Sequence, residues 1–433
     1  MKVLIITYYW PPSGGSGVQR WLKFATYLSD FGIEPVIYTV DNPSYAILDK
    51  TLENEVPKSV KIIKQSIREP NNFLSLFGKK NKKTSAGFLD ANPSFFGKIA
   101  QYIRANYFIP DARKYWIKPS VKFLTEYLSK NTIDMVITTG PPHSLHLIGL
   151  ELKKKLGVNW MADFRDPWTD IDYFHQLPLT NRAKEKHYQL EKEVVSMADC
   201  VLVVGKTMQQ NYLKYNKKIE VITNGFDGGL NTDNVQLDKK FTVVHVGLMN
   251  ADRNPQVLFR VISELIKENK DFANDFQLIL IGKLADDVNK SLEKHQLKSY
   301  VKIIDYLPHN EVINFQKMAQ VLLLVVNNVP NAKGIITGKI FEYLQANRPV
   351  LAIGPTDGDL AGIISKTNSG TIVDFNDDKI LRNTLIEFYK EYKNHNLVVK
   401  SKNIEQYHRK NLTRKLANII NSVSLSDVDN YKG

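Results

Sequence analysis

The sequence has little cysteine and no long apolar run, and these two shortages exclude several classes of protein. Cys200 is the only cysteine in 433 residues, which excludes an intrachain disulfide framework and a cysteine-rich metal site. Val321 to Val326 is typical of the longest apolar runs, and a bilayer span needs roughly 18–20 residues. The apolar run at residues 3–6 leads into aromatics and prolines, unlike a signal peptide. We therefore expect a cytoplasmic protein.

Acidic residues are also in short supply. Lysine and arginine number 58 against 45 aspartates and glutamates, a formal net charge of +13. Such an excess favours anionic partners, which include nucleic acid, acidic lipid head groups and phosphorylated small molecules. No set of nucleic-acid-binding motifs is present, and many lysines fall on predicted solvated helix faces. We predict no nucleic-acid partner and favour a peripheral contact with the inner face of an anionic membrane.

Short apolar segments alternate with helical segments in two series along the chain. The predicted strands are 2–7, 34–40, 134–138, 160–163, 200–204 and 220–222, then 241–246, 276–281, 301–304, 321–325, 350–353 and 370–373. This alternation is typical of doubly wound parallel sheets. The turn-rich segment 223–229 separates the two series. The fold class is therefore α/β, with two Rossmann-like domains in tandem.

The first strand is followed by a glycine-rich turn and a helix. Gly14, Gly15 and Gly17 precede the helical segment 19–30. Glycines allow the backbone to approach a ligand, and the N-terminus of a helix attracts negative charge. The spacing differs from GxGxxG, so ordinary dinucleotide binding is not supported. The alternative interpretation is a plain glycine-rich turn.

Charged residues follow the predicted strand 160–163. Asp163, Arg165 and Asp166 lie where ligands bind in open α/β sheets, beyond the carboxyl ends of the strands. The alternative is a structural Arg–Asp pair. Asp170 and Asp172 form a DxD pattern, but two acids in an acid-containing loop are weak evidence for a metal ion. We predict no metal site.

Residues 71–119 have the composition of an insertion in the first domain. They contain the basic run at 79–83 and a helical stretch from Phe95 to Arg104 that combines aromatic residues with Lys98. Basic charge between aromatics is typical of a helix that docks on an anionic bilayer. The alternative is a helix packed on the core beside a basic loop.

The segment from Gly334 to Gly354 contains a loop, a helix over 337–346, a turn and a buried strand. The helix N-terminus at Gly338 and the nearby Lys339 suit a phosphate. Glu342 lies on the same side of the helix, and a carboxylate suits a neutral diol such as a ribose. This combination indicates a sugar nucleotide. The alternative is an exposed Lys–Glu pair on a surface helix.

In the second domain, the first strand ends at Gly247, and Arg253 follows at the start of the next helix. A guanidinium group matches the geometry of phosphate oxygens. We interpret Arg253 as a phosphate ligand, and the alternative is an ordinary surface arginine.

Five segments, taken in order, resemble the retaining family-4 glycosyltransferases of the GT-B fold. The segments are YYWPPSGGSGVQR (8–20), ADFRDPW (162–168), VITNGFD (221–227), HVGLMNADRNP (245–255) and TGKIFEYLQANRPVLA (337–352). The resemblance implies two doubly wound Rossmann-like domains facing across a cleft. Residues 1–222 would form the acceptor side and residues 223–395 the nucleotide-sugar side. Residues 396–433 would form a helix that crosses back to the first domain.

The resemblance also implies roles for individual residues. Arg253 and Lys339 would hold the diphosphate, and Glu342 would accept the ribose hydroxyls. The residues facing the acceptor or the donor sugar would be Asp163, Arg165 and Asp166, which complete the catalytic set. The donor would further be lined by Gly14, Gly15, Gly17, Asn224, Gly247 and Gly338.

Two positions depart from the usual family pattern. Gly334 stands where many members have a first glutamate, and Leu248 stands where many have a basic residue. Both changes resemble a subset of the family with the GKxFEYL form. The missing carboxylate usually touches the donor sugar, so the identity of that sugar stays open.

The predicted function is transfer of a sugar from a nucleotide-diphosphate sugar to a hydroxyl of a lipid-linked or polysaccharide acceptor. The resemblance implies retention at the anomeric carbon, and we predict no metal ion and no cofactor. One alternative is another GT-B enzyme, such as a sugar-nucleotide epimerase or a phosphorylase. The other is a non-catalytic module that binds an anionic surface.

Overall fold

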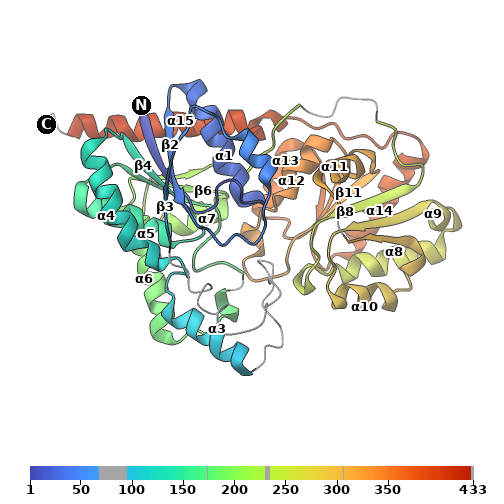
Figure 1. Ribbon diagram of the computed structural model, residues 1–433. Helices are drawn as coiled ribbons and strands as arrows, with labels where there is room; N and C mark the ends of the chain where they lie inside the picture. The colour runs from blue at the N-terminus through green and yellow to red at the C-terminus, as the bar shows by residue number, and fades with distance from the viewer. Residues whose placement is uncertain (68–94, 173, 230–234, 306, 431–433) are drawn as a thin grey trace. The chain divides into compact units, whose positions relative to one another are not determined.

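The computed structural model describes residues 1–67, 95–172, 174–229, 235–305 and 307–430 (Figure 1). The chain divides into two compact units. Unit 1 contains residues 1–223 and 409–433, and unit 2 contains residues 224–408. Each unit is built on one parallel sheet with its own apolar core. The basic run at 79–83 lies outside the described residues.

The sheet of unit 1 has seven strands in the order β3-β2-β1-β4-β5-β6-β7, all parallel. They are β1 (Lys2–Ile6), β2 (Glu34–Val40), β3 (Lys61–Gln65), β4 (Met135–Gly140), β5 (Trp160–Phe164), β6 (Cys200–Val203) and β7 (Ile219–Val221). The central strands are buried along their length, as expected when helices cover both faces. The strand order reverses between β1 and β4, and this reversal is a topological switch point.

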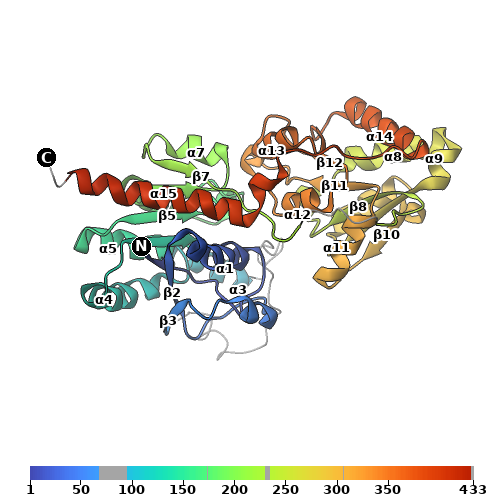
Figure 2. The same cartoon turned by 90° about the horizontal axis from the view of Figure 1, so that it is seen from above.

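Helices cover both faces of this sheet. The helices of unit 1 are α1 (Ser16–Leu28), α3 (Phe95–Tyr107), α4 (Lys114–Lys130), α5 (Ser144–Leu156), α6 (Asn181–Met197), α7 (Lys206–Tyr212) and α15 (Arg409–Asn430), of which α3 packs against α6. Helix α15 lies beside α1 (Figure 2), and Leu416 and Ile420 share a buried cluster with Trp21. The returning segment of unit 1 therefore begins at Arg409. Residues 396–408, which we expected in the returning segment, group with unit 2.

The sheet of unit 2 has six parallel strands in the order β10-β9-β8-β11-β12-β13. They are β8 (Phe241–Val246), β9 (Phe276–Ile281), β10 (Val301–Ile304), β11 (Val321–Val325), β12 (Val350–Ile353) and β13 (Gly370–Val373). Its main helices are α8 (Gln256–Glu268), α9 (Lys270–Asp275), α10 (Asp286–Lys294), α11 (His309–Met318), α12 (Lys339–Ala346), α13 (Asp359–Thr367) and α14 (Asp378–Lys393). The switch point of this sheet lies between β8 and β11.

Two local features account for the C-terminal end of α12. The helix is closed by Asn347, which adopts the left-handed conformation with a φ of 55°, and asparagine tolerates that conformation better than most residues. Pro349 then prevents the helix from continuing. Over the described ranges, none of the helices is both long and apolar enough to span a bilayer.

Candidate active site

The predicted site residues fall into two groups, one at the switch point of each sheet. In unit 2, Arg253 follows β8 at the end of a short 3-10 turn. Its Nε donates to Asn327 Oδ1 at 3.0 Å, and its Nη1 donates to the carbonyl oxygen of Leu248 at 3.0 Å. Leu248 follows β8 and Asn327 follows β11. The guanidinium group is therefore held between the two strands where the order reverses, which is where ligands bind in such sheets.

The first turn of α12 carries the second cation. Lys339 Nζ lies 3.1 and 3.0 Å from the two carboxylate oxygens of Glu342, and Gln316 Nε2 donates to Glu342 Oε2 at 2.9 Å. The side chains of Lys339 and Glu342 are 34% and 29% exposed. An ion pair with this much exposure contributes little to stability. Both groups can therefore exchange their contact for a ligand at small cost.

Tyr343 fixes α12 to the sheet. Its hydroxyl accepts from the backbone N–H of Val246 at 3.1 Å and donates to the carbonyl oxygen of Leu323 at 3.2 Å. Burial raises the pKa of Tyr343 above its ordinary value, so the hydroxyl stays protonated and continues to donate. One buried side chain thus sets the position of Lys339 and Glu342 relative to β8 and β11.

His245 is a polar residue of this site that sequence reasoning missed. It is 4% exposed, and Nδ1 lies 3.1 Å from the carbonyl oxygen of Leu323, so Nδ1 carries the proton. Burial lowers the pKa of His245 to about 4, and the charges of Arg253 and Lys339 act in the same direction. The imidazole is therefore neutral at pH 7. The signal in the sequence was a single histidine in a strand whose other residues, apart from Thr242, are apolar.

The other predicted donor residues of unit 2 have different local roles. Gly247 has a φ of 128°, a region that favours glycine. Gly338 has an ordinary helical φ of −58°, and a Cβ there would meet nothing within 4 Å. The backbone therefore does not require glycine at 338, and its effect is to leave open space at the N-terminus of α12. Asn224 is the first residue of unit 2 and is half-buried.

In unit 1, the structure corrects the role predicted for Asp163. The residue has no exposed surface. Its carboxylate pairs with Arg20 at 2.8 Å and accepts from Trp21 Nε1 at 2.7 Å and Thr139 Oγ1 at 2.9 Å. Burial acts to raise the pKa of Asp163, but the charge and hydrogen bonds of Arg20 outweigh it and hold the pKa below its ordinary value. Asp163 is therefore a buried structural group and does not face a sugar.

Arg165 joins the loops that meet at the switch point of unit 1. Its Nη1 donates to the carbonyl oxygen of Gly17 at 2.7 Å and its Nε to that of Gly140 at 3.2 Å, while Nη2 donates to the carbonyl oxygen of Pro141. Gly17 follows β1, and Gly140 ends β4. Asp166 is exposed in the same loop. Arg165 and Asp166 thus stand where the sequence predicted them, at the carboxyl end of the sheet.

The glycine-rich turn of unit 1 has local structural reasons for each of its glycines. A Cβ at Gly14 would lie 2.8 Å from Ile47 Cγ2, and one at Gly17 would lie 2.5 Å from Arg165 Nη1. Gly15 has a φ of 95°. The loop is therefore shaped by close packing and by a left-handed residue, before any contact with a ligand is considered.

Two histidines lie beside the switch point of unit 1, at the start of α5. His143 is 9% exposed and stacks on Trp168, with ring centroids 4.8 Å apart and planes 5° apart. His146 is fully buried and stacks on Phe164 at 4.3 Å. Burial lowers the pKa of His146 to about 3. Both rings are uncharged at pH 7, because burial also lowers the pKa of His143.

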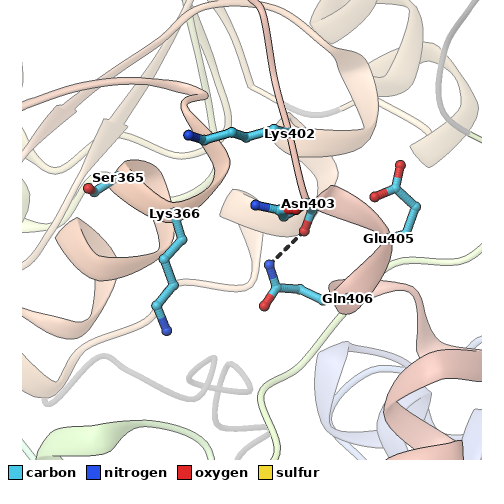
Figure 3. Close-up of a pocket in the computed structure, with 6 residues that line it drawn as sticks. All are labelled: Ser365, Lys366, Lys402, Asn403, Glu405 and Gln406. Atoms are coloured by element: carbon cyan, nitrogen blue, oxygen red, sulfur yellow. Dashed lines mark hydrogen bonds between the residues drawn. The ribbon is translucent and has the colours of Figure 1, made fainter.

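Unit 2 also has an open surface pocket away from the candidate site (Figure 3). It is lined by Ser365, Lys366, Lys402, Asn403, Glu405 and Gln406. Gln406 Nε2 donates to the carbonyl oxygen of Asn403 at 2.7 Å. Ser365 and Lys366 lie at the end of α13, just before β13 begins. The pocket is therefore at the amino edge of the sheet, opposite the strand ends that carry Arg253. It contains none of the predicted site residues.

Asp170 and Asp172 do not assemble into a metal centre in the described part of the chain, where no group of three or more His, Cys, Asp or Glu side chains is arranged to hold an ion. Asp170 instead accepts a hydrogen bond from Asn211 Nδ2 at 3.3 Å.

Comparisons with known proteins bear on both the fold and the second unit. Residues 231–410 match the family model described as Glycosyl transferases group 1, which covers most of unit 2 and less than half of the chain. No curated protein matches the sequence.

Three solved structures are similar over almost their whole length. A sucrose-phosphate synthase from Thermosynechococcus elongatus is 15% identical with a TM-score of 0.57, covering 100% of this chain and 98% of its own. WaaG, a glycosyltransferase involved in lipopolysaccharide biosynthesis, is 14% identical with a TM-score of 0.55, covering 96% and 99%. A putative UDP-N-acetylglucosamine 2-epimerase from Listeria monocytogenes is 14% identical with a TM-score of 0.54, covering 97% and 96%. The predicted two-domain GT-B fold is confirmed.

Proposed function

We propose that this protein is a retaining glycosyltransferase of family-4 type, which moves a sugar from a nucleotide-diphosphate sugar to an acceptor hydroxyl. One observation carries the proposal. Arg253, Lys339 and Glu342 gather at the switch point of the unit 2 sheet, within the residues that match the glycosyl transferases group 1 model. Two cations and a carboxylate suit a diphosphate joined to a ribose.

The donor uses groups that the fold already holds in place. Arg253 is anchored by Asn327 and Leu248, so its guanidinium group is already oriented at the switch point where a phosphate would bind. When the donor binds, the ammonium group of Lys339 leaves Glu342 and pairs with the diphosphate. The carboxylate of Glu342 then accepts hydrogen bonds from the ribose hydroxyls. Open space at Gly338 lets the diphosphate approach the amides at the start of α12.

The chemistry needs a stabilised leaving group. The bond between the anomeric carbon and the diphosphate oxygen breaks, and the electron pair stays on the diphosphate. The acceptor oxygen bonds to the anomeric carbon on the same face, and its proton passes to an oxygen of the departing phosphate. Arg253, Lys339 and the helix amides stabilise the developing charge, which is worth about 3–4 kcal/mol for one such donor. With these groups in place, the reaction as we propose it uses no metal ion.

We further propose that the acceptor is lipid-linked or a polysaccharide at a membrane surface, and helix α3 supports this. Ile99, Tyr102 and Ile103 are 43–45% exposed, although they share one side of the helix. Asn106 follows on the same side of the helix, where its Nδ2 donates to the carbonyl oxygen of Pro178 at 2.8 Å. The three apolar side chains are thus accessible on a helix that also carries Lys98 and Arg104 and contains no acidic residue. This arrangement suits an anionic bilayer surface.

Product analysis tests the proposed function. The protein is incubated with each common nucleotide sugar, a set of octyl glycosides and a chelator, and the products are separated by mass and by anomeric configuration. We expect a disaccharide glycoside with the anomeric configuration of the donor. An inverted product, or loss of all activity on chelation that only a metal ion restores, contradicts the corresponding part of the proposal.

The second candidate function is that of a sugar-nucleotide epimerase, which is suggested by the structural similarity to a putative epimerase. The same assay distinguishes it from a glycosyltransferase. An epimerase forms an isomeric sugar without using the acceptor. An epimer in place of a disaccharide would therefore assign the site to that reaction.

A further inference from the structure

Helix α6 carries two buried polar side chains, His187 and Glu191, that have no role in the reaction proposed above. They are four residues apart and so lie on the same side of the helix. Each is 6% exposed. Both reach the loop that follows β5, which carries Arg165 and Asp166.

The carboxylate of Glu191 accepts several hydrogen bonds from that loop. It accepts from the backbone N–H groups of Trp168 and Thr169, each at 3.2 Å, and from Thr169 Oγ1. Tyr212 adds a fourth bond, from its hydroxyl to Glu191 Oε1 at 2.6 Å. Burial, followed by the charge of Glu191, raises the pKa of Tyr212 well above its ordinary value, so this hydroxyl keeps its proton. A carboxylate offers about four acceptor sites, and Glu191 accepts three bonds at Oε1 and one at Oε2.

His187 holds the side chain of the same tryptophan. Trp168 Nε1 donates to His187 Nδ1 at 3.0 Å, so Nδ1 carries no proton. Burial lowers the pKa of His187 to about 4, and the charge of Lys186 acts in the same direction. The ring is therefore neutral at pH 7 and able to accept. Glu191 fixes the backbone at Trp168 while His187 fixes its indole.

The indole of Trp168 in turn stacks on the imidazole of His143, with 4.8 Å between the ring centroids. His143 Nδ1 and His146 Nε2 are both buried without a hydrogen-bond partner in the described structure. A Cβ placed on Gly140 would lie 3.1 Å from the first nitrogen and 2.5 Å from the second. The contacts that start on α6 therefore end at two imidazoles beside the switch point of unit 1.

We propose that Glu191 and His187 are positioning residues of the acceptor side: they fix the loop after β5 and, through Trp168, hold His143 beside the switch point. This inference rests on the proposed function, because a glycosyltransferase of this fold is expected to place its acceptor on unit 1. The four groups Glu191, His187, Trp168 and His143 form what we call the α6 clamp.

Two variants of Glu191 and one control on the same helix test the clamp. In Glu191→Gln, the amide oxygen replaces Oε1 and keeps the bonds from both backbone N–H groups and Tyr212, while the amide nitrogen donates to the Thr169 hydroxyl. Glu191→Ala removes all four bonds. Val195→Ala is the control, because Val195 is fully buried on α6 and its side chain takes no part in the clamp.

Two readouts are taken at a temperature well below the unfolding midpoint of every variant. Hydrogen exchange reports on the amides of Trp168 and Thr169. Transfer from the nucleotide sugar to octyl glycosides reports KM for the acceptor and kcat. For Glu191→Ala we expect faster exchange and a loss in kcat/KM for the acceptor of about tenfold to a hundredfold. Glu191→Gln restores most of both readouts, and Val195→Ala leaves both close to the wild-type values.

Equal losses in Glu191→Ala and Val195→Ala would overturn the proposal, since Glu191 would then act through general stability alone. A Glu191→Gln variant as poor as Glu191→Ala would also overturn it, because charge and not hydrogen bonding would be responsible. Nucleotide binding, measured separately, is expected to be unchanged in all three variants. If the wild type binds a nucleotide sugar yet transfers nothing to any glycoside, the proposed function fails and the acceptor role of the clamp fails with it.

Discussion

The two switch points of the molecule hold their charges in opposite ways. In unit 1, the Arg20–Asp163 pair is 2% and 0% exposed and has its hydrogen bonds supplied by the protein. In unit 2, the Lys339–Glu342 pair is 34% and 29% exposed and is held by contacts that a ligand can replace. The ion pairs near the two switch points thus have different roles. The buried pair stabilises the fold, and the exposed pair remains available for binding.

The largest expected contrast is in the free energy of unfolding. Asp163→Ala leaves Arg20 buried without its partner, and removing one member of a buried pair costs about 3–5 kcal/mol. Glu342→Ala removes an exposed pair and should cost less than about 1 kcal/mol. Urea unfolding of both variants measures the difference. A similar loss of unfolding free energy in the two variants would contradict the different roles of the buried and the exposed pair.

The second contrast is catalytic. Lys339→Ala removes one donor to the leaving diphosphate, so we expect kcat to fall by about 10²–10³-fold while the unfolding midpoint stays nearly unchanged. Lys333→Ala is the matched control, because Lys333 is an exposed lysine of unit 2 that pairs with Asp357 outside the proposed site. Turnover near the wild-type value in Lys339→Ala would contradict the site assignment.

A third prediction concerns pH. His146 and His245 have folded pKa values lowered to about 3 and about 4. The unfolded state therefore binds protons first, at its ordinary pKa near 6.5, and stability falls as the pH drops below that value. The loss contributed by His245 continues down to about pH 4. In His245→Gln, the fall in unfolding free energy between about pH 6.5 and 4 should be smaller than in the wild type, and an identical fall would contradict the assigned environment.

The smallest expected effect is on membrane contact. Ile103→Glu places a negative charge on the exposed apolar side of α3 and should weaken binding to phosphatidylglycerol vesicles by about tenfold. Leu156→Glu changes a similarly exposed apolar residue, 42% exposed at the end of α5, and should have little effect. Co-sedimentation of both variants makes the test, and equal binding would show that α3 is not the contact.

Much of the fold could be predicted from the sequence, because the strands are short apolar runs bounded by turn residues. Val350 to Ile353, which Asn347 and Pro349 set off from α12, is an example. The tandem pair of parallel sheets follows from the alternation of such strands with helices. The point at which the chain returns to unit 1 could not be predicted, because it is set by contacts between α15 and α1, which lie far apart in the sequence.

The positions of the predicted site residues followed more directly from the sequence in unit 2 than in unit 1, and their roles in binding stay predictions. Arg253, Lys339 and Glu342 lie close to helix starts, where spacing along the chain determines spacing in the structure. Asp163 was misread because its partner Arg20 is 143 residues away, and the sequence does not show which side of the strand a residue faces. His187 and Glu191 were missed for the same reason, since each acts through a partner that the topology supplies.

The most direct test of the account is thermal unfolding of the wild type and of Lys339→Ala against a panel of nucleoside diphosphates and nucleotide sugars. A ligand that binds only the folded state raises the unfolding midpoint by mass action. We predict a rise for the wild type with one nucleoside diphosphate and its sugar, and a much smaller rise for Lys339→Ala. No rise with any nucleotide, or an equal rise in both proteins, would contradict the claim that this exposed pair binds the donor.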